Sequence, residues 1–288
     1  MKTFAQQFNE TMNANLSKKD KIEALVKIGL PERMATQYVS AYAKNNTEGC
    51  IYTFGVELEM QVSYRRVLAR NNGVNFQAQG YNHTDSREVF KFVPDGSLMG
   101  ADSIECVSPI LDGTKDGFDT LKKACEAINA QGAHVNKSCG FHVHIGAADL
   151  TDEQYINVFV NYQMIEGVID SFMAPSRRGN ASRWCASLAG NDFSACDTKH
   201  AVLRALHGVR YYKVNACAYD RHKTIEFRQH QGTTDYEKIS NWVKFCIALV
   251  DFSKSCRLTS KVTSIDDITF IDDDVKSFFK ARIAHFAA

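Results

Sequence analysis

The stretch FGVELEM (residues 54–60) alternates apolar side chains with glutamates, and the same alternation returns twice further along the chain. It recurs in FHVHI (141–145), with imidazoles at the polar positions, and in TIEFRQH (224–230), with carboxylate, guanidinium and imidazole groups. Successive side chains of a β-strand point to opposite faces, so each stretch predicts a strand with one apolar face and one face of reactive groups. These groups bind hard divalent metals and phosphate.

Each of these motifs has an ordinary structural explanation when it is taken alone. Paired glutamates are common on a solvated strand face, a His-x-His pair is often structural, and Glu-x-Arg-x-His suits a cross-strand ion pair. Together they favour one shared site, to which SIECVSPIL (103–111) adds a further glutamate. The candidate residues are Glu57, Glu59, Glu105, His142, His144, Glu226, Arg228 and His230. The turn Asp95-Gly96-Ser97 is expected at the rim of the same sheet, where a turn needs no function.

The rest of the chain mixes further strands with long helices. Strand-like runs cover 89–93 and 209–219, and helical periodicity covers 118–130, 152–173 and 234–252. Thr151 and Gln154 resemble a capping box at the start of the second of these helices. Residues 1–48 have helical spacing interrupted by Pro31. We expect 62–88 to be a long loop that is either a lid or a solvated insertion, and 173–208 is a second candidate gate. We therefore predict an α+β protein with a helical appendage at 1–48 and a main domain at 49–288.

Composition excludes several classes of protein. The 288 residues include 34 Lys and Arg against 33 Asp and Glu, so no basic excess indicates nucleic acid as the main partner. The nine cysteines form no CxxC pair, which argues against a zinc ribbon and favours a reducing compartment. No apolar run reaches the roughly 20 residues that span a bilayer, and MKTFAQQFNE lacks the apolar core of a secretion signal. We expect a cytoplasmic protein without a membrane partner.

Several familiar catalytic motifs are missing from the sequence. No GxxxxGK[ST], GxGxxG, HExxH or GxSxG occurs, so neither a P-loop nor a dinucleotide-binding turn is present. A chain with metal-binding carboxylates and an arginine can nevertheless bind ATP through metal ions that bridge its phosphates.

The order of these motifs resembles the amidoligase family, a group of carboxylate–amine ligases with a glutamine-synthetase-like fold. The resemblance covers about residues 50–255 and rests on FGVELEM (54–60), PDGSL (94–98), ECVSPIL (105–111), GFHVHIG (140–146), APSRRGN (174–180) and TIEFRQHQGT (224–233). It implies a curved antiparallel sheet flanked by helices, which holds ATP and two or three Mg²⁺ or Mn²⁺ ions. It also implies an enzyme that joins a carboxylate to an amine and releases ADP and phosphate.

The resemblance assigns a role to each motif residue. The metal ligands would be Glu57, Glu59, Glu105, His142 and Glu226; the phosphate or nucleotide contacts would be His144, Arg177, Arg178 and Asn215. Arg228 would stabilise the transferred phosphoryl group or hold the carboxylate. Glu59 and His230 are both candidates for the base that deprotonates the amine, and the sequence does not choose between them. The amine and carboxylate substrates and the oligomeric state are left open.

Three alternatives remain at this point. His142, His144 and a glutamate have the composition of the iron or zinc site in a cupin-like oxygenase or hydrolase, although that site leaves Glu57, Glu59 and Arg228 unexplained. A second alternative is a binding protein that keeps a degenerate ligase fold. A third is a nucleophilic cysteine, with Cys139 and Cys185 as candidates, although free cysteines are usually small buried apolar residues.

Overall fold

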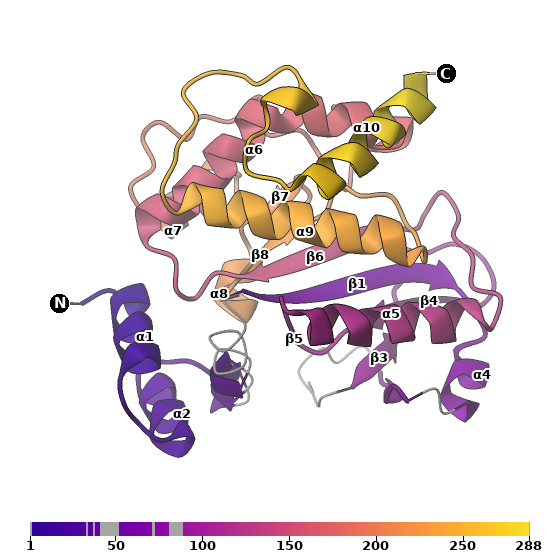
Figure 1. Cartoon of the computed structure of the whole chain (residues 1–288), viewed down its shortest axis with the longest axis horizontal. Helices are drawn as coiled ribbons and strands as arrows, with labels where there is room; N and C mark the ends of the chain where they lie inside the picture. The colour runs from indigo at the N-terminus through magenta and orange to yellow at the C-terminus, as the bar shows by residue number, and fades with distance from the viewer. Residues whose placement is uncertain are drawn as a thin grey trace. The chain divides into compact units, whose positions relative to one another are not determined.

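The computed structural model describes residues 2–32, 34–36, 38–40, 52–70, 73–80 and 89–287 (Figure 1). The backbone divides into two compact units, and each is described by itself. Unit 1 comprises Met1–Cys139 with Gly232–Tyr236, and unit 2 comprises Gly140–Gln231 with Glu237–Ala288.

In the part of unit 1 that the structure describes, the strands are β1 (Thr53–Gln61), β2 (Phe76–Ala78), β3 (Phe90–Val93), β4 (Ser103–Val107) and β5 (Leu111–Asp112). They are ordered β2-β3-β4-β1, with β5 paired to the start of β1. The β2–β3 pair is parallel and the other pairs are antiparallel. The register sets Glu59 of β1 directly opposite Glu105 of β4, so two carboxylates from distant parts of the chain share one face of the sheet.

The other face of this sheet is apolar and is covered by helix α5 (Lys115–Asn129). Val56, Leu58 and Met60 are buried on β1 at the positions between the glutamates. Phe54 on the same face packs against Phe118 of α5, with ring centroids 5.1 Å apart. Burial of this apolar face fixes the register of β1, because a shift by one residue would turn the carboxylates into the core.

The described residues of unit 1 also form helices α1 (Phe4–Asn13), α2 (Lys18–Lys27) and α4 (Tyr64–Ala69). The helical prediction for the N-terminal region is confirmed for α1 and α2, whereas the predicted boundary at residue 48 lies outside the described residues. The prediction of one loop over 62–88 is wrong in part, because α4 and β2 fall within it. The Phe76 ring on β2 packs against Phe90 and Phe92 of β3, and these contacts hold the short strand in place.

Unit 2 contains three antiparallel strands, β6 (Phe141–Gly146), β7 (Val214–Asn215) and β8 (Thr224–Phe227), in the order β6-β8-β7. The register sets His144 and Asn215 on either side of Glu226. Two of the predicted strands are too long: 209–219 keeps only two strand residues, and β8 ends before Arg228. The ending of β8 matters for the site, because alternation along a strand no longer fixes the side chains beyond it.

The helices of unit 2 are α6 (Asp152–Phe172), α7 (Lys199–Ala205), α8 (Ala218–His222), α9 (Tyr236–Ser253) and α10 (Asp273–Ala287), with 3₁₀ turns at Pro175–Arg177 and Ile265–Asp267. The predicted capping box is confirmed: the Thr151 hydroxyl accepts from the Gln154 amide, and the Gln154 side chain accepts from the Thr151 amide. Helices α6, α9 and α10 meet at Phe172, whose ring packs against Trp242, Phe245 and Phe279. This aromatic cluster is the centre of the unit's core.

The prediction of a mixed α+β protein with mostly antiparallel strands flanked by helices is confirmed. The glutamine-synthetase-like form of the sheet stays a prediction. Among the described residues no helix combines the length and the apolar character that crossing a membrane requires.

Candidate active site

Three carboxylates gather on the polar face of unit 1. Glu59, Asp95 and Glu105 each offer an oxygen, and these oxygens lie within 4.8 Å of one another. Glu59 and Glu105 are buried, at 6% and 4% exposure, and they belong to paired strands. Asp95 comes from the turn after β3, where its carboxylate also accepts from the Ser97 amide at 2.6 Å. We call these residues the carboxylate cluster; oxygen ligands at this spacing suit a hard divalent cation.

Glu57 and Lys91 share this polar face with the carboxylate cluster. A carboxylate oxygen of Glu57 lies within 4.8 Å of one of Glu105. Lys91 of β3 is 3% exposed and lies in the same cross-strand row as Val107 and Glu57. The row adds one buried cation to the acidic face, which offsets part of its negative charge.

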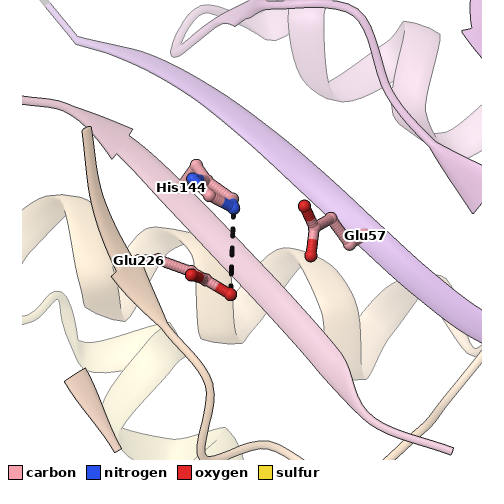
Figure 2. Close-up of side chains that lie close together, drawn as sticks. All are labelled: Glu57, His144 and Glu226. Carbon is pink, nitrogen blue, oxygen red and sulfur yellow. Dashed lines mark ion pairs between the residues drawn. The ribbon is translucent and has the colours of Figure 1, made fainter. Parts of the chain in front are cut away.

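Glu226 is the centre of the functional face of unit 2. Its Oε1 lies 3.6 Å from His142 Nδ1 and 3.9 Å from His144 Nε2, and Figure 2 marks the second of these ion pairs. All three side chains are largely buried. We call them the histidine–glutamate group. Glu57, the third residue labelled in Figure 2, comes from β1 of unit 1.

Three neighbours orient the histidine–glutamate group. The Asn215 side-chain amide donates to Glu226 Oε2 at 2.5 Å, and Arg228 Nη1 donates to Glu226 Oε1. A hydrogen bond of 2.9 Å joins Thr224 Oγ1 to His144 Nδ1. Because this hydrogen bond occupies Nδ1 of His144, Nε2 is the nitrogen directed to Glu226.

His230 lies apart from these groups. Its ring packs edge-on against that of Phe141, with centroids 5.3 Å apart, and its centroid lies 6.0 Å from that of Trp242. Its Nδ1 lies 2.7 Å from the Gln231 carbonyl oxygen. Burial lowers the pKa of His230 to about 3. The strand alternation that grouped His230 with Glu226 fails here because β8 ends at Phe227. The role of His230 as the base stays a prediction.

Arg177 and Arg178 lie in the segment that follows α6. Arg177 is 7% exposed, and its carbonyl accepts from the Gln229 side-chain amide at 3.0 Å. The Arg178 guanidinium lies over the ring of Phe286 in α10, and its Nε donates to the Met173 carbonyl at 2.8 Å. These contacts fix the segment to the core of unit 2; a nucleotide contact by either arginine stays a prediction.

A buried lysine just before β7 forms ion pairs with helix α6. Lys213 is fully buried, and its Nζ lies 2.8 Å from Glu166 and 2.6 Å from Asp170, both on α6. The Gln229 side-chain amide donates to Asp170 as well, and Tyr162 donates to Gln229. The other oxygens of Glu166 and Asp170 accept from the backbone amides of Leu188 and Gly179. This buried lysine network therefore ties α6, the segment before β7 and the segment after β8 together.

The sequence-based reasoning missed Asp95, Thr224 and Lys213. Asp95 was expected at the rim of the same sheet, but only as part of a turn that needs no function, and not as a ligand. Lys213 had a signal, because Glu166 and Asp170 are one helical turn apart on a helix whose other buried residues are mostly apolar. Such a pair on a buried face predicts a buried cation as its partner.

Unit 1 thus offers hard oxygen ligands, and unit 2 offers paired imidazoles and a guanidinium; each set contains groups that bind metal ions or anionic substrates. The two candidate cysteines contribute none of these groups; both are buried. A comparison with curated proteins gave no match. The model of a family described as "Putative amidoligase enzyme" matches residues 50–193 and 188–250, which include every strand named above and all the candidate site residues. The chain therefore belongs to this amidoligase family.

Proposed function

We propose that this chain is an ATP-dependent carboxylate–amine ligase that forms an amide or isopeptide bond through an acyl phosphate. The observation that carries the proposal is the carboxylate cluster, in which three oxygen donors from two strands and a turn converge. The match to the amidoligase family also supports the proposal. A ligase that activates a carboxylate with ATP needs groups that neutralise the negative charge of the phosphates.

The donor sets fit the proposed metal ions. Glu59, Asp95 and Glu105 offer only carboxylate oxygens, which Mg²⁺ and Mn²⁺ prefer. Glu57, His142 and Glu226 are the further ligands that we assign from the family. Metal ions held by these residues would neutralise the charge of the ATP phosphates.

The proposed reaction has two steps. An oxygen of the substrate carboxylate attacks the γ-phosphorus of ATP, forming an acyl phosphate and releasing ADP. The amine nitrogen then attacks the acyl carbon, the C–N bond forms, the C–O bond to phosphate breaks, and a base takes the proton from nitrogen. The chain's part is to position the reactants and to offset developing charge.

Two side chains carry most of this task. Arg228 has a forked guanidinium that suits a carboxylate or the equatorial oxygens of a phosphoryl group, and its present partner Glu226 holds it at the strand end. Of the two candidate bases we propose Glu59, because the contacts of His230 with Phe141 and Trp242 keep that ring away from the polar face. His144, Asn215, Arg177 and Arg178 remain the proposed phosphate or nucleotide contacts.

One observation favours a second function. His142 and His144 both approach the same oxygen of Glu226 within unit 2, and two histidines with one carboxylate are the ligand set of non-haem iron and of some zinc sites. The second candidate is therefore a metal-dependent oxygenase or hydrolase of cupin-like type. It gives no role to the carboxylate cluster, so we place it after the ligase.

The test is the thermal unfolding midpoint with ATP alone, Mg²⁺ alone, both together, and Fe²⁺ or Zn²⁺ alone. A ligand that binds only the folded state at about 100 times its Kd stabilises it by about 2.7 kcal/mol. We expect a rise that needs ATP and Mg²⁺ together and disappears in Glu226→Gln. Glu153→Gln, an exposed carboxylate on α6, is the matched control and should respond like the wild type.

One result would contradict the ligase proposal, and another would contradict its metal assignment. A midpoint that ignores ATP but rises with Fe²⁺ or Zn²⁺, and does so only while His142 and His144 are intact, would favour the second candidate. A full ATP and Mg²⁺ response in Glu226→Gln would remove Glu226 from the ligand set.

A further inference from the structure

Asp95, one of the three residues of the carboxylate cluster, lies in a segment that buries none of its own residues. This segment, residues 94–102 between β3 and β4, is called the Asp95 loop, and each of its residues is exposed or partly exposed. Its Met99 is 68% exposed. Burial of apolar side chains is the usual force that holds a segment in place, so this loop relies on hydrogen bonds instead.

Met99 is the residue at which these hydrogen bonds converge. Its amide donates to the Ser138 hydroxyl at 3.0 Å, and its carbonyl accepts from the Asn136 side-chain amide at 2.6 Å. The same carbonyl accepts from the Ser103 hydroxyl at 3.0 Å and from the Gln61 side-chain amide at 3.3 Å. Both backbone polar groups of one exposed residue are thus bonded to side chains from other parts of unit 1.

Asn136 and Ser138 form a closed ring of hydrogen bonds with Met99, and we call these two residues the Met99 clamp. The Ser138 hydroxyl accepts from Met99 and donates to Asn136 Oδ1 at 2.6 Å, while the Asn136 amide donates back to the Met99 carbonyl. The Ser138 backbone amide also donates to Asn136 Oδ1 at 2.8 Å. Because that amide can only donate, it fixes which end of the Asn136 side chain faces Met99.

The clamped residue is linked directly to Asp95. The Leu98 amide donates to the Asp95 carbonyl at 3.3 Å, and the Ser97 amide donates to the Asp95 carboxylate at 2.6 Å. On the other side of Met99, Gly100 has a φ of 109°, and a Cβ added there would lie 1.9 Å from Gln61 Nε2. The loop backbone therefore lies directly against the end of β1, and a shift of Met99 would move the turn that carries Asp95.

We propose that Asn136 and Ser138 are positioning residues that hold Asp95 in place for metal binding with Glu59 and Glu105. Their side chains bond the Met99 backbone and each other, so they act through Asp95 and not as ligands. Groups that hold a ligand in place commonly matter nearly as much to metal affinity as the ligand does. The metal-binding part of this inference rests on the proposed function, whereas the effect of the clamp on the loop does not.

The first measurement is isothermal titration calorimetry of the whole chain with Mn²⁺ and no nucleotide. Asn136→Ala and Ser138→Ala should each weaken Mn²⁺ binding about tenfold, and Ser138→Thr, which keeps the hydroxyl, should restore it. Asn129→Ala is the matched control. Asn129 makes the same kind of bond in the same unit, from its side-chain amide to the Thr234 carbonyl at 2.7 Å, so this variant should bind Mn²⁺ as the wild type does.

A double variant separates positioning from a general loss of stability. If the clamp acts through Asp95, Asp95→Asn/Asn136→Ala should bind Mn²⁺ no more weakly than Asp95→Asn alone, because coupled residues are not additive. Hydrogen exchange in the metal-free protein is the second measurement. Exchange of the amides of residues 97–99 should be at least about tenfold faster in Asn136→Ala than in the wild type, and unchanged in Asn129→Ala.

The outcomes separate this inference from the proposed function. Unchanged Mn²⁺ affinity or unchanged exchange in Asn136→Ala, an equal loss of affinity in Asn129→Ala, or losses that multiply in the double variant would each overturn the positioning role. A thermal response to ATP and Mg²⁺ in a protein that binds no Mn²⁺ alone would overturn this inference and keep the ligase. Mn²⁺ binding that weakens in Asn136→Ala, without any ATP response, would overturn the ligase and leave a metal site with its positioning residues.

Discussion

Glu226 is a buried carboxylate whose surroundings suit it to a functional site. It is 4% exposed; Asn215 binds its Oε2, whereas Oε1 faces Arg228 and both histidines of the histidine–glutamate group. The hydrogen bond to Oε2 therefore fixes the side chain, whereas Oε1 is the oxygen that faces the site. A buried charge is tolerated when several partners compensate for its loss of water, and each partner here also limits its rotation.

Asp95 is expected to bind a metal ion as part of the carboxylate cluster. Asp95→Asn should weaken Mn²⁺ binding at least about tenfold, because it replaces one charged oxygen ligand by a neutral amide. Isothermal titration calorimetry with Mn²⁺ measures the change. Asp102→Asn is the control: this exposed aspartate has a φ of 57°, which asparagine also tolerates, so the variant should bind Mn²⁺ as the wild type does. Equal affinity in both variants would exclude Asp95 as a ligand.

His230 should make the stability of the protein depend on pH. Its pKa is lowered from 6.5 to about 3 by burial, so the unfolded chain binds a proton that the folded chain does not between these values. The neutral ring thus favours folding above pH 6.5, and this contribution is lost as the pH falls toward 3. Between pH 7 and pH 5 the loss should be about 2 kcal/mol in the free energy of unfolding.

Urea unfolding followed by tryptophan fluorescence tests this at the two pH values in the wild type and in His230→Gln, which cannot titrate. Carboxylates add their own pH dependence to both proteins, so the difference between the two slopes is the informative quantity. If the free energy of unfolding changed equally with pH in both proteins, the His230 ring would be solvated, contrary to its contacts with Phe141 and Trp242.

Helix α6 begins at a complete capping box, and this capping box should contribute measurably to the stability of the protein. Thr151→Ala removes the hydroxyl that accepts from the Gln154 amide at 3.2 Å, and should lower the free energy of unfolding by about 1 kcal/mol. Chemical denaturation measures the change. Thr151→Ser keeps the accepting oxygen and should lose much less; a loss as large as that of alanine would show that the threonine methyl group, and not the cap, matters.

The junction of α6 with the segment before β7 depends on the buried lysine network. Lys213→Met leaves the buried carboxylate of Glu166 and the partly buried carboxylate of Asp170 without their cation and should cost about 3 kcal/mol. The triple variant Lys213→Met/Glu166→Gln/Asp170→Asn removes both negative charges and keeps acceptors for the backbone amides, so most of the loss should return. Chemical denaturation of both variants is the measurement, and a triple variant less stable than the single one would contradict the charge argument.

At the scale of the whole molecule, the proposed ligands are contributed by both compact units. Glu59→Gln in unit 1 and Glu226→Gln in unit 2 should therefore each abolish the thermal stabilisation by ATP with Mg²⁺, while the unliganded midpoints change little. The double variant should add nothing further, since groups that act on one ligand are not additive. If Glu59→Gln kept the full response, ligand binding would belong to unit 2 alone.

Sequence reasoning succeeded where the pattern was local. The alternation in 54–60 and 141–145 predicts β1 and β6, because burying one face selects the register. The capping box at Thr151 needs only residues four positions apart at most. The strand predicted over 224–230 is too long, because β8 ends at Phe227, and the packing of Phe141 and Trp242 decides where the His230 ring lies.

The sequence by itself therefore determined the α+β class, the main strands and helices, the reactive residue types and the membership of the amidoligase family. Only the tertiary structure decided which of those residues meet: Asp95 with Glu59 and Glu105, and Lys213 with two carboxylates of α6. The physical reason is that hydrophobic periodicity and capping act over a few residues. Ion pairs and ligand clusters instead form between segments that strand pairing and core packing bring together from distant parts of the chain.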